Sequence, residues 1–244
     1  MIVNPTQIGW EVIYQPAHAL LAARIAAHWR EDQRPKRWIE TLVALAQHDD
    51  EARDWTGLDH LTDSGAPLDF SLSAPSLRQP RQVTEDLQYK GQWGALMISM
   101  HMVFLYDNLR NESAEFAAFL KEQETCQEHW RKALKVTKKE AEAAYALFQW
   151  CDRMSLILCR QELPEAERAL EVSAGPDGTR YDVICRDDTV TIQPWPFEET
   201  EFALYVETIR LEQLSFKDDA ALKAALESTP VTERMWSFRK YLTQ

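Results

Sequence analysis

The hydrophobic pattern of the first two thirds of the chain predicts helices behind a short opening strand. Residues 8–14 place alternate apolar side chains on one side, which is the period-2 pattern of a half-buried strand. Helical patterns then run from Pro16 towards Pro35, from about 36 to 48, and over 92–109, 112–133 and 138–161. Residues 54–91 are rich in Gly, Pro and Ser, which is typical of a long irregular segment with room for short helices.

After Pro164 the pattern changes to short strands. The stretches L-E-V-S-A, Y-D-V-I-C, T-V-T-I-Q and the longer F-A-L-Y-V-E-T-I-R-L alternate or run apolar, and a helix at about 218–228 precedes a last extended segment near 231–240. We therefore expect a mainly α protein, with a helical domain over 1–164 and a small β-rich (α+β) appendage over 165–244 packed on it. Because short strands need a surface on which to bury one face, the opening strand with Trp10 is the expected partner.

Composition limits the classes of partner. The chain is 45% hydrophobic with nine tryptophans, so it can bury a sizeable core. A formal net charge of −12 disfavours nucleic acid and anionic membranes as partners, and no apolar run is long enough to span a bilayer. Four cysteines without a C-x-x-C pair favour reduced thiols. We expect a cytoplasmic protein and leave a homodimer open.

Polar side chains on the apolar faces of four predicted helices are the candidate chemistry. His18 shares a face with Leu21, Ile25 and Trp29, at spacings of 3, 4 and 4. His48 and Asp49 end the second apolar helix, and His101 lies four residues from Met97 and from Leu105. Asp152 lies amid F-Q-W-C-D-R-M-S-L-I-L-C, where an unpaired buried carboxylate would be costly.

Taken singly, each of these residues has an ordinary structural explanation. A lone inward histidine is more often a hydrogen-bonded core residue than a metal ligand, and an inward aspartate can cap a neighbouring helix. Together, however, three histidines and two aspartates are directed at one core, and these are donor types that bind first-row divalent metals. The sequence therefore predicts a shared site for a divalent metal at His18, His48, Asp49, His101 and Asp152.

The ordered set resembles the HD-domain superfamily of metal-dependent phosphohydrolases, helical proteins with a histidine, a later H-D dipeptide and a distant aspartate as ligands. Here these would be His18, His48-Asp49 and Asp152, with C-D-R-M-S-L around the last one, and the likeness covers residues 10–162. The segments G-W-E-V-I-Y-Q-P-A-H-A, Q-H-D-D and P-W-P-F also resemble an uncharacterised bacterial family, taken as a divergent branch. In contrast to many superfamily members, H-D-D-E-A-R-D-W has no glycine and lysine after the dipeptide.

The resemblance implies an HD-like helical bundle that binds one or two ions of Mn, Fe or Zn and hydrolyses a small phosphorylated substrate, a phosphomonoester or nucleotide. Asp49 and Glu51 would be the catalytic carboxylates, and Arg24, Arg37, Arg153 or Lys90 would hold phosphate oxygens. Two alternatives stay open. The first is a non-catalytic metal-binding or scaffold protein, and the second is an oxidative di-iron helical protein, which normally needs paired E-x-x-H motifs that this chain lacks.

Overall fold

A computed structural model describes residues 1–50 and 60–241 of the chain. Its helices are α1 (Gln15–Ala27), α2 (Trp38–Gln47), α3 (Arg78–Lys90), α4 (Gln92–Tyr106), α5 (Ala114–Leu134), α6 (Lys138–Cys159) and α7 (Asp219–Ser228). Its strands are β1 (Ile2–Pro5), β2 (Trp10–Ile13), β3 (Ala169–Ala174), β4 (Arg180–Arg186), β5 (Thr189–Gln193), β6 (Glu201–Leu211) and β7 (Val231–Arg239). Short 3₁₀ turns lie at Glu31–Gln33, Phe70–Leu72 and Asp107–Leu109.

The strands form one sheet, which shows that the predicted mainly α fold is wrong. Within the described residues the sheet has seven strands in the order β1-β2-β6-β7-β5-β4-β3, so the protein is a mixed α/β structure and not a helical bundle with a small appendage. The neighbouring strands are antiparallel except β5 and β7, which are parallel. Strands from both ends of the chain thus build one layer.

The β1–β2 hairpin joins this sheet through β6. Trp10 lies opposite Leu211 in the register, which confirms the expected partnership between the opening strand and the C-terminal strands. Gly9 permits the close approach, because a Cβ at this position would lie 1.9 Å from the carbonyl oxygen of Leu211. The paired strands β2 and β6 are some two hundred residues apart in the sequence. Local sequence patterns carry little information about which distant strands pair.

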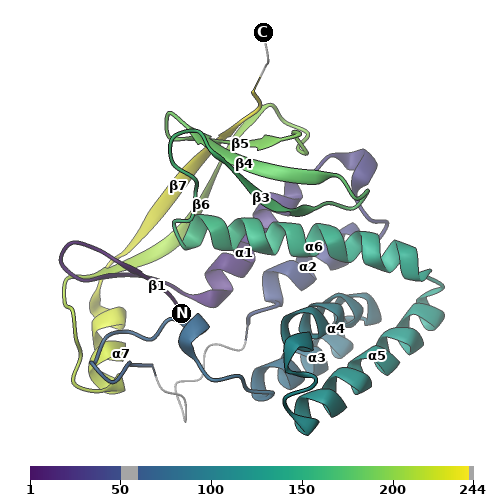
Figure 1. Cartoon of the computed structure of the whole chain (residues 1–244), viewed down its shortest axis with the longest axis horizontal. Helices are drawn as coiled ribbons and strands as arrows, with labels where there is room; N and C mark the ends of the chain where they lie inside the picture. The colour runs from purple at the N-terminus through teal and green to yellow at the C-terminus, as the bar shows by residue number, and fades with distance from the viewer. Residues whose placement is uncertain (51–59, 242–244) are drawn as a thin grey trace.

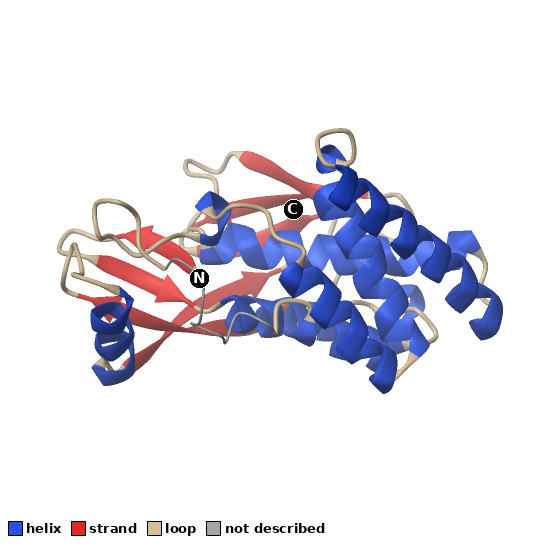
Figure 2. Cartoon of the chain, turned by 90° about the horizontal axis from the view of Figure 1, so that it is seen from below, coloured by secondary structure: helices blue, strands red, loops and turns tan. Residues whose placement is uncertain are grey.

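Helices α1 to α6 lie on one side of the sheet in two layers (Figure 1), and α7 packs in a separate cluster with Ile209 and Leu211 of β6. Figure 1 shows α1 and α6 next to the sheet, with α3, α4 and α5 farther from it, and α1 also contacts α2. Figure 2 shows the same packing from below, with α7 apart from the other helices at the far end of the sheet. α1 and α6 are therefore covered on both sides, by strands and by helices.

An aromatic cluster joins α1 and α6 to the sheet. The fully buried rings of Trp29 and Trp150 are 4.9 Å apart in an edge-to-face arrangement, and both rings pack against Tyr181 and Phe197. Large buried aromatic rings contribute much of the apolar surface that stabilises a core. This contact helps to hold the two helices that carry His18 and Asp152.

Several local predictions hold. The helices expected from about 36 to 48, over 92–109, 112–133, 138–161 and 218–228 are confirmed as α2, α4, α5, α6 and α7. α6 begins with a capping box, in which the side chain of Thr137 accepts from the backbone N–H of Glu140 and the Glu140 side chain accepts from that of Thr137. None of the helices in the described ranges combines the length and the hydrophobicity needed to cross a bilayer.

Candidate metal centre

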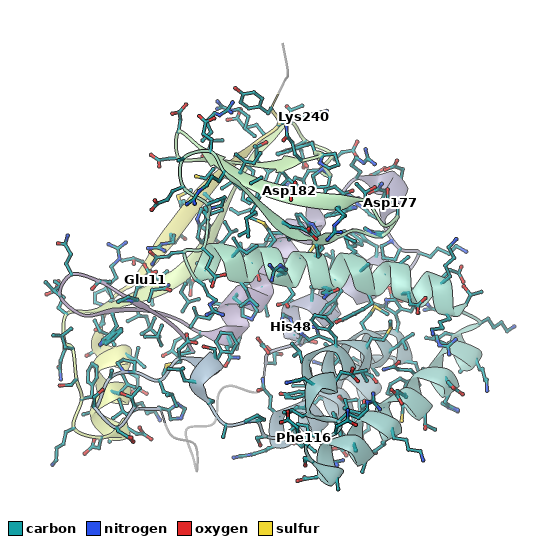
Figure 3. The ribbon with its side chains drawn as sticks, in the orientation of Figure 1. Glu11, His48, Phe116, Asp177, Asp182 and Lys240 are labelled. Carbon is teal, nitrogen blue, oxygen red and sulfur yellow. The ribbon has the colours of Figure 1, made fainter. Side chains whose placement is uncertain are left out.

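Four helices bring the predicted histidines and aspartates together around His48, which is labelled in Figure 3. His18 comes from α1, His48 and Asp49 directly follow α2, His101 comes from α4 and Asp152 from α6. Two overlapping groups have ligand atoms within 4.8 Å of one another: His18, His48 and Asp49, and His48, His101 and Asp152. The sequence thus predicted a set of residues that the fold does bring to one place, and these groups could hold a metal ion.

His48 is the central member, shared by both groups. Its ring lies 5.2 Å from that of His18 and 5.2 Å from that of His101, each in an edge-to-face arrangement. Its Nε2 lies 3.1 Å from Asp152 Oδ1 and 3.7 Å from Asp49 Oδ2. All three histidines are about 2% exposed and Asp152 is 7% exposed, whereas the Asp49 side chain is 18% exposed. The cluster therefore meets solvent mainly beside Asp49.

The Nδ1 atoms of the three histidines are used for contacts outside the cluster. His48 Nδ1 donates to the carbonyl oxygen of Leu45 at 2.7 Å, which satisfies one of the free carbonyls at the end of α2. His18 Nδ1 lies 3.0 Å from Ser155 Oγ, and His101 Nδ1 lies 3.3 Å from the hydroxyl of Tyr145. The Nε2 atoms are the ring nitrogens nearest to the carboxylates, and His18 Nδ1 also lies 3.9 Å from Asp152 Oδ1.

The carboxylates and imidazoles of the cluster shift one another's pKa values. Burial raises the pKa of Asp49, but His48 and His18 outweigh this effect and hold its pKa well below the usual value. Burial also raises the pKa of Asp152, and its hydrogen bond to His48 overrides this and lowers its pKa. For His48 burial lowers the pKa, yet Asp49 and Asp152 raise it to about 9. Both carboxylates are thus ionised and need positive charge beside them.

The pKa of His101 is shifted in the opposite direction to that of His48. Burial is the largest effect on its pKa and lowers it to about 4, in spite of the attraction of Asp152. Its Nε2 lies 3.9 Å from Asp152 Oδ2, a longer separation than that of His48 from the same side chain. At neutral pH His101 is therefore a neutral imidazole, the form in which histidine binds metals.

The comparisons with known proteins identify a family without an assigned function. The family described as "Protein of unknown function (DUF3891)" matches residues 1–213. The chain belongs to this family. No curated protein and no solved structure matches the chain. The resemblance to the HD-domain superfamily is therefore wrong: the match is to DUF3891, and the sheet described above replaces the expected helical bundle.

The arginines predicted to hold phosphate lie away from the cluster. Arg24 donates to the backbone oxygen and the hydroxyl of Tyr205 on β6, both at 3.0 Å. Arg37 precedes α2 at the end opposite His48. Arg153 follows Asp152 in sequence, but its side chain donates to the carbonyl oxygen of Glu171 on β3 at 3.4 Å. Of the other predicted groups, Lys90 donates to Gln47 at 2.8 Å, and Glu51 lies outside the described residues.

Ser155 and Tyr145 are members of the site to which the sequence analysis gave no role. Both lie on α6, three residues after and seven residues before Asp152, so helical periodicity places them on the face of that carboxylate. The spacing alone could have identified them as neighbours of the cluster. Their hydrogen bonds to histidines on α1 and α4 depend on how the helices pack, which the spacing does not reveal.

Proposed function

We propose that this member of DUF3891 binds a divalent metal ion at the His-Asp cluster and uses it to hydrolyse a small phosphorylated substrate. The observation that carries the proposal is the convergence of three buried Nε2 atoms on two ionised carboxylates, with every Nδ1 occupied outside the cluster. Histidine ligands generally donate their other ring N–H to a fixed acceptor in this way. A cation between these groups would replace the protons that otherwise separate them.

The donor set suits Mn²⁺, Fe²⁺ or Zn²⁺. Imidazole nitrogen binds Zn and Fe readily, and carboxylate oxygen extends the range to Mn. Both groups of ligand atoms consist of histidine and aspartate and share His48. Because Nε2 of His48 has one lone pair, it would bind one ion, and a second ion would need ligands other than His48. Two carboxylates would neutralise the charge of one divalent ion, which lowers the cost of placing the ion in a buried site.

The chain's own contribution to hydrolysis would be concentrated at Asp49. Its side chain is the most exposed of the five, so substrate and water would approach from its side. Asp49 Oδ2 faces His18 at 2.6 Å, which leaves Oδ1 for a hydrogen bond to water or substrate. When bound, a divalent ion supplies an activated water at neutral pH and stabilises negative charge on a phosphoryl group.

Metal binding without catalysis is the second candidate, and one observation favours it. Arg24 and Arg153 donate hydrogen bonds to β6 and β3, and Arg37 lies at the far end of α2. A phosphate held in the cluster would therefore lack the guanidinium contacts expected from the sequence. The two candidates share the metal site and differ in whether a substrate is turned over.

Metal analysis and a substrate panel distinguish the candidates. The purified protein is assayed for bound metal, then loaded with Mn²⁺, Fe²⁺, Co²⁺, Ni²⁺ or Zn²⁺ and tested for phosphate release from mono-, di- and cyclic nucleotides and from simple phosphate esters. Asp49→Ala should lose both metal and turnover, whereas the exposed Asp63→Ala should retain both. Metal-loaded protein without turnover supports the second candidate, and failure to bind any of the metals rejects both.

A further inference from the structure

Ser155 links the backbone of α6 to the ring of His18. Its side chain is fully buried, and its hydroxyl donates to the carbonyl oxygen of Asp152 at 2.7 Å. The same oxygen lies 3.0 Å from His18 Nδ1. A serine hydroxyl carries a single hydrogen, and here that hydrogen is used on Asp152. With its hydrogen used in this way, Ser155 offers Nδ1 of His18 a lone pair and so favours a proton on Nδ1.

This hydrogen bond decides which nitrogen of His18 can bind a cation. His18 Nε2 lies 2.6 Å from Asp49 Oδ2, a hydrogen bond that needs a proton between the ring and the ionised carboxylate. A cation bound at Nε2 would take the place of that proton, and the proton of the neutral ring would then lie on Nδ1. The other tautomer would direct an Nδ1 lone pair at a hydroxyl oxygen whose hydrogen is already used. It would also place an N–H where the ligand atom is needed.

The other two histidines are held differently. His48 Nδ1 donates to a backbone carbonyl of its own helix, which no side-chain substitution removes. The hydroxyl of Tyr145 can donate to or accept from His101 Nδ1, so this contact allows either tautomer. Ser155 is thus a side chain whose hydrogen bond to the Asp152 carbonyl favours the tautomer of His18 that can bind a cation at Nε2.

We propose that Ser155 is a positioning residue of the metal site, which keeps the proton of His18 on Nδ1 and presents Nε2 as the ligand atom. The inference rests on the metal site proposed above and adds a residue that touches neither metal nor substrate. The chain of contacts runs from the Asp152 carbonyl through Ser155 and His18 to Asp49, and so connects α6, α1 and the end of α2. Partners of this kind typically change metal affinity 10–100-fold when removed.

Ser155→Ala tests the proposal, with Ser99→Ala as the matched control. Ser99 is also a fully buried helical serine, and its hydroxyl contacts the Gln123 carbonyl and Gln127, outside the cluster. Zn²⁺ affinity is measured by calorimetric titration of the full chain. We expect Ser155→Ala to bind Zn²⁺ about 10–100-fold more weakly, and Ser99→Ala to bind as the parent protein does.

Nitrogen NMR of the His18 ring shows which ring nitrogen carries the proton, and a change in packing alone would not alter this. In the Zn²⁺-loaded parent protein the proton should lie on Nδ1 and the metal on Nε2, and in Ser155→Ala the Nδ1 proton should lose its protection from exchange. If Ser155→Ala retains both parental affinity and a protected Nδ1 proton, the inference is overturned while the metal site stands. If the parent protein binds no Zn²⁺ or other divalent ion, both proposals fail.

Ser155→Cys keeps the test decisive if the alanine variant does not fold. A thiol has nearly the same shape as the hydroxyl but is a weak hydrogen-bond acceptor. Because a thiolate is itself a zinc ligand, this variant is titrated with Mn²⁺, which prefers oxygen ligands, and we expect weakened Mn²⁺ binding relative to the parent protein. A parental Mn²⁺ affinity would contradict the positioning role.

Discussion

Two buried clusters of polar side chains differ in whether the chain itself balances their charge. Glu11, about 1% exposed, lies 2.9 Å from an Arg234 nitrogen, and its carboxylate also accepts from the side-chain amides of Asn4 and Gln161. Arg210 lies 3.8 Å from the same carboxylate. In the His-Asp cluster, two carboxylates face imidazole nitrogens, and no lysine or arginine contact to Asp49 or Asp152 is found among the described residues. Figure 3 shows Glu11 and His48 in separate parts of the molecule.

The difference separates a cluster with a structural role from a candidate binding site. A buried carboxylate with a guanidinium and two amide donors is satisfied by the fold alone. A buried carboxylate among imidazoles has a charge that depends on protons or on a bound cation, so its stability varies with the solution. Glu11 therefore fastens the β1–β2 hairpin to the sheet, and we expect the His-Asp cluster to respond to pH and to a divalent metal.

Replacing His48 with alanine should give the largest effect on metal binding. His48 belongs to both ligand groups, so its loss leaves neither group complete. We expect Zn²⁺ affinity to fall by at least about 100-fold, more than for loss of a supporting hydrogen bond. Calorimetric titration of the purified variant measures this change.

Replacing Glu11 with alanine should lower the stability of the fold and leave metal binding unchanged. Removing one partner of a buried ion pair costs about 3 kcal/mol, at the low end of the usual range because Arg234 is 24% exposed and can be hydrated. The loss should be the same with and without Zn²⁺, and Zn²⁺ affinity should not change. Urea unfolding in both conditions checks this, and a loss that depends on Zn²⁺ would mean that the two clusters are coupled.

The helical faces were predictable because periodicity is a local property. His18, Asp152 and His101 follow spacings of three and four on apolar faces, and these spacings alone direct the three side chains towards the core. The H-D dipeptide was predicted at the end of α2, and the Nδ1 contact of His48 with Leu45 shows how the helix end orients the ring. The inward direction of these side chains could therefore be predicted from helix geometry.

The sheet and the arginines were not predictable in the same way. The partnership of the opening strand with the C-terminal strands was expected, but its pairing with β6 and the single seven-stranded sheet over the described residues follow from the tertiary fold. Arg153 adjoins Asp152, yet one residue turns a helical side chain by about 100°, which directs Arg153 to β3. Sequence proximity to a ligand therefore did not imply proximity to the site.

Metal affinity should depend on pH through His48. Burial lowers its pKa and the two carboxylates raise it to about 9, above the ordinary 6.5. In the metal-free protein this imidazolium contributes stability that is fully present below pH 6.5 and is lost as the pH rises through about 9. Because a ligand must release its proton, Zn²⁺ affinity should rise about tenfold per pH unit from neutrality and level off above about 9.

Titrations at several pH values measure this dependence, together with the number of protons released. The Glu11→Ala variant is the control, because its substitution lies outside the cluster and should leave the slope unchanged. An affinity that does not vary between pH 7 and 9 would show that His48 gives up no proton on binding. It would also weaken the contrast between the two clusters.

Arg153→Ala should give the smallest effect, and it tests whether the site extends past α6. The Arg153 side chain lines an open groove of about 550 Å³ with Phe104, Gln149 and Arg180, on the β3 side of α6, and donates to Glu171 rather than to the cluster. We therefore expect Zn²⁺ affinity within about twofold of the parent value and a loss of stability within about 0.5 kcal/mol, as for other exposed substitutions. The same variant is compared with the parent protein in any phosphate-release assay that gives turnover. An increase in KM at constant Zn²⁺ affinity would show that substrate reaches the groove, whereas unchanged KM would confine the site to the face of α6 that carries Asp152.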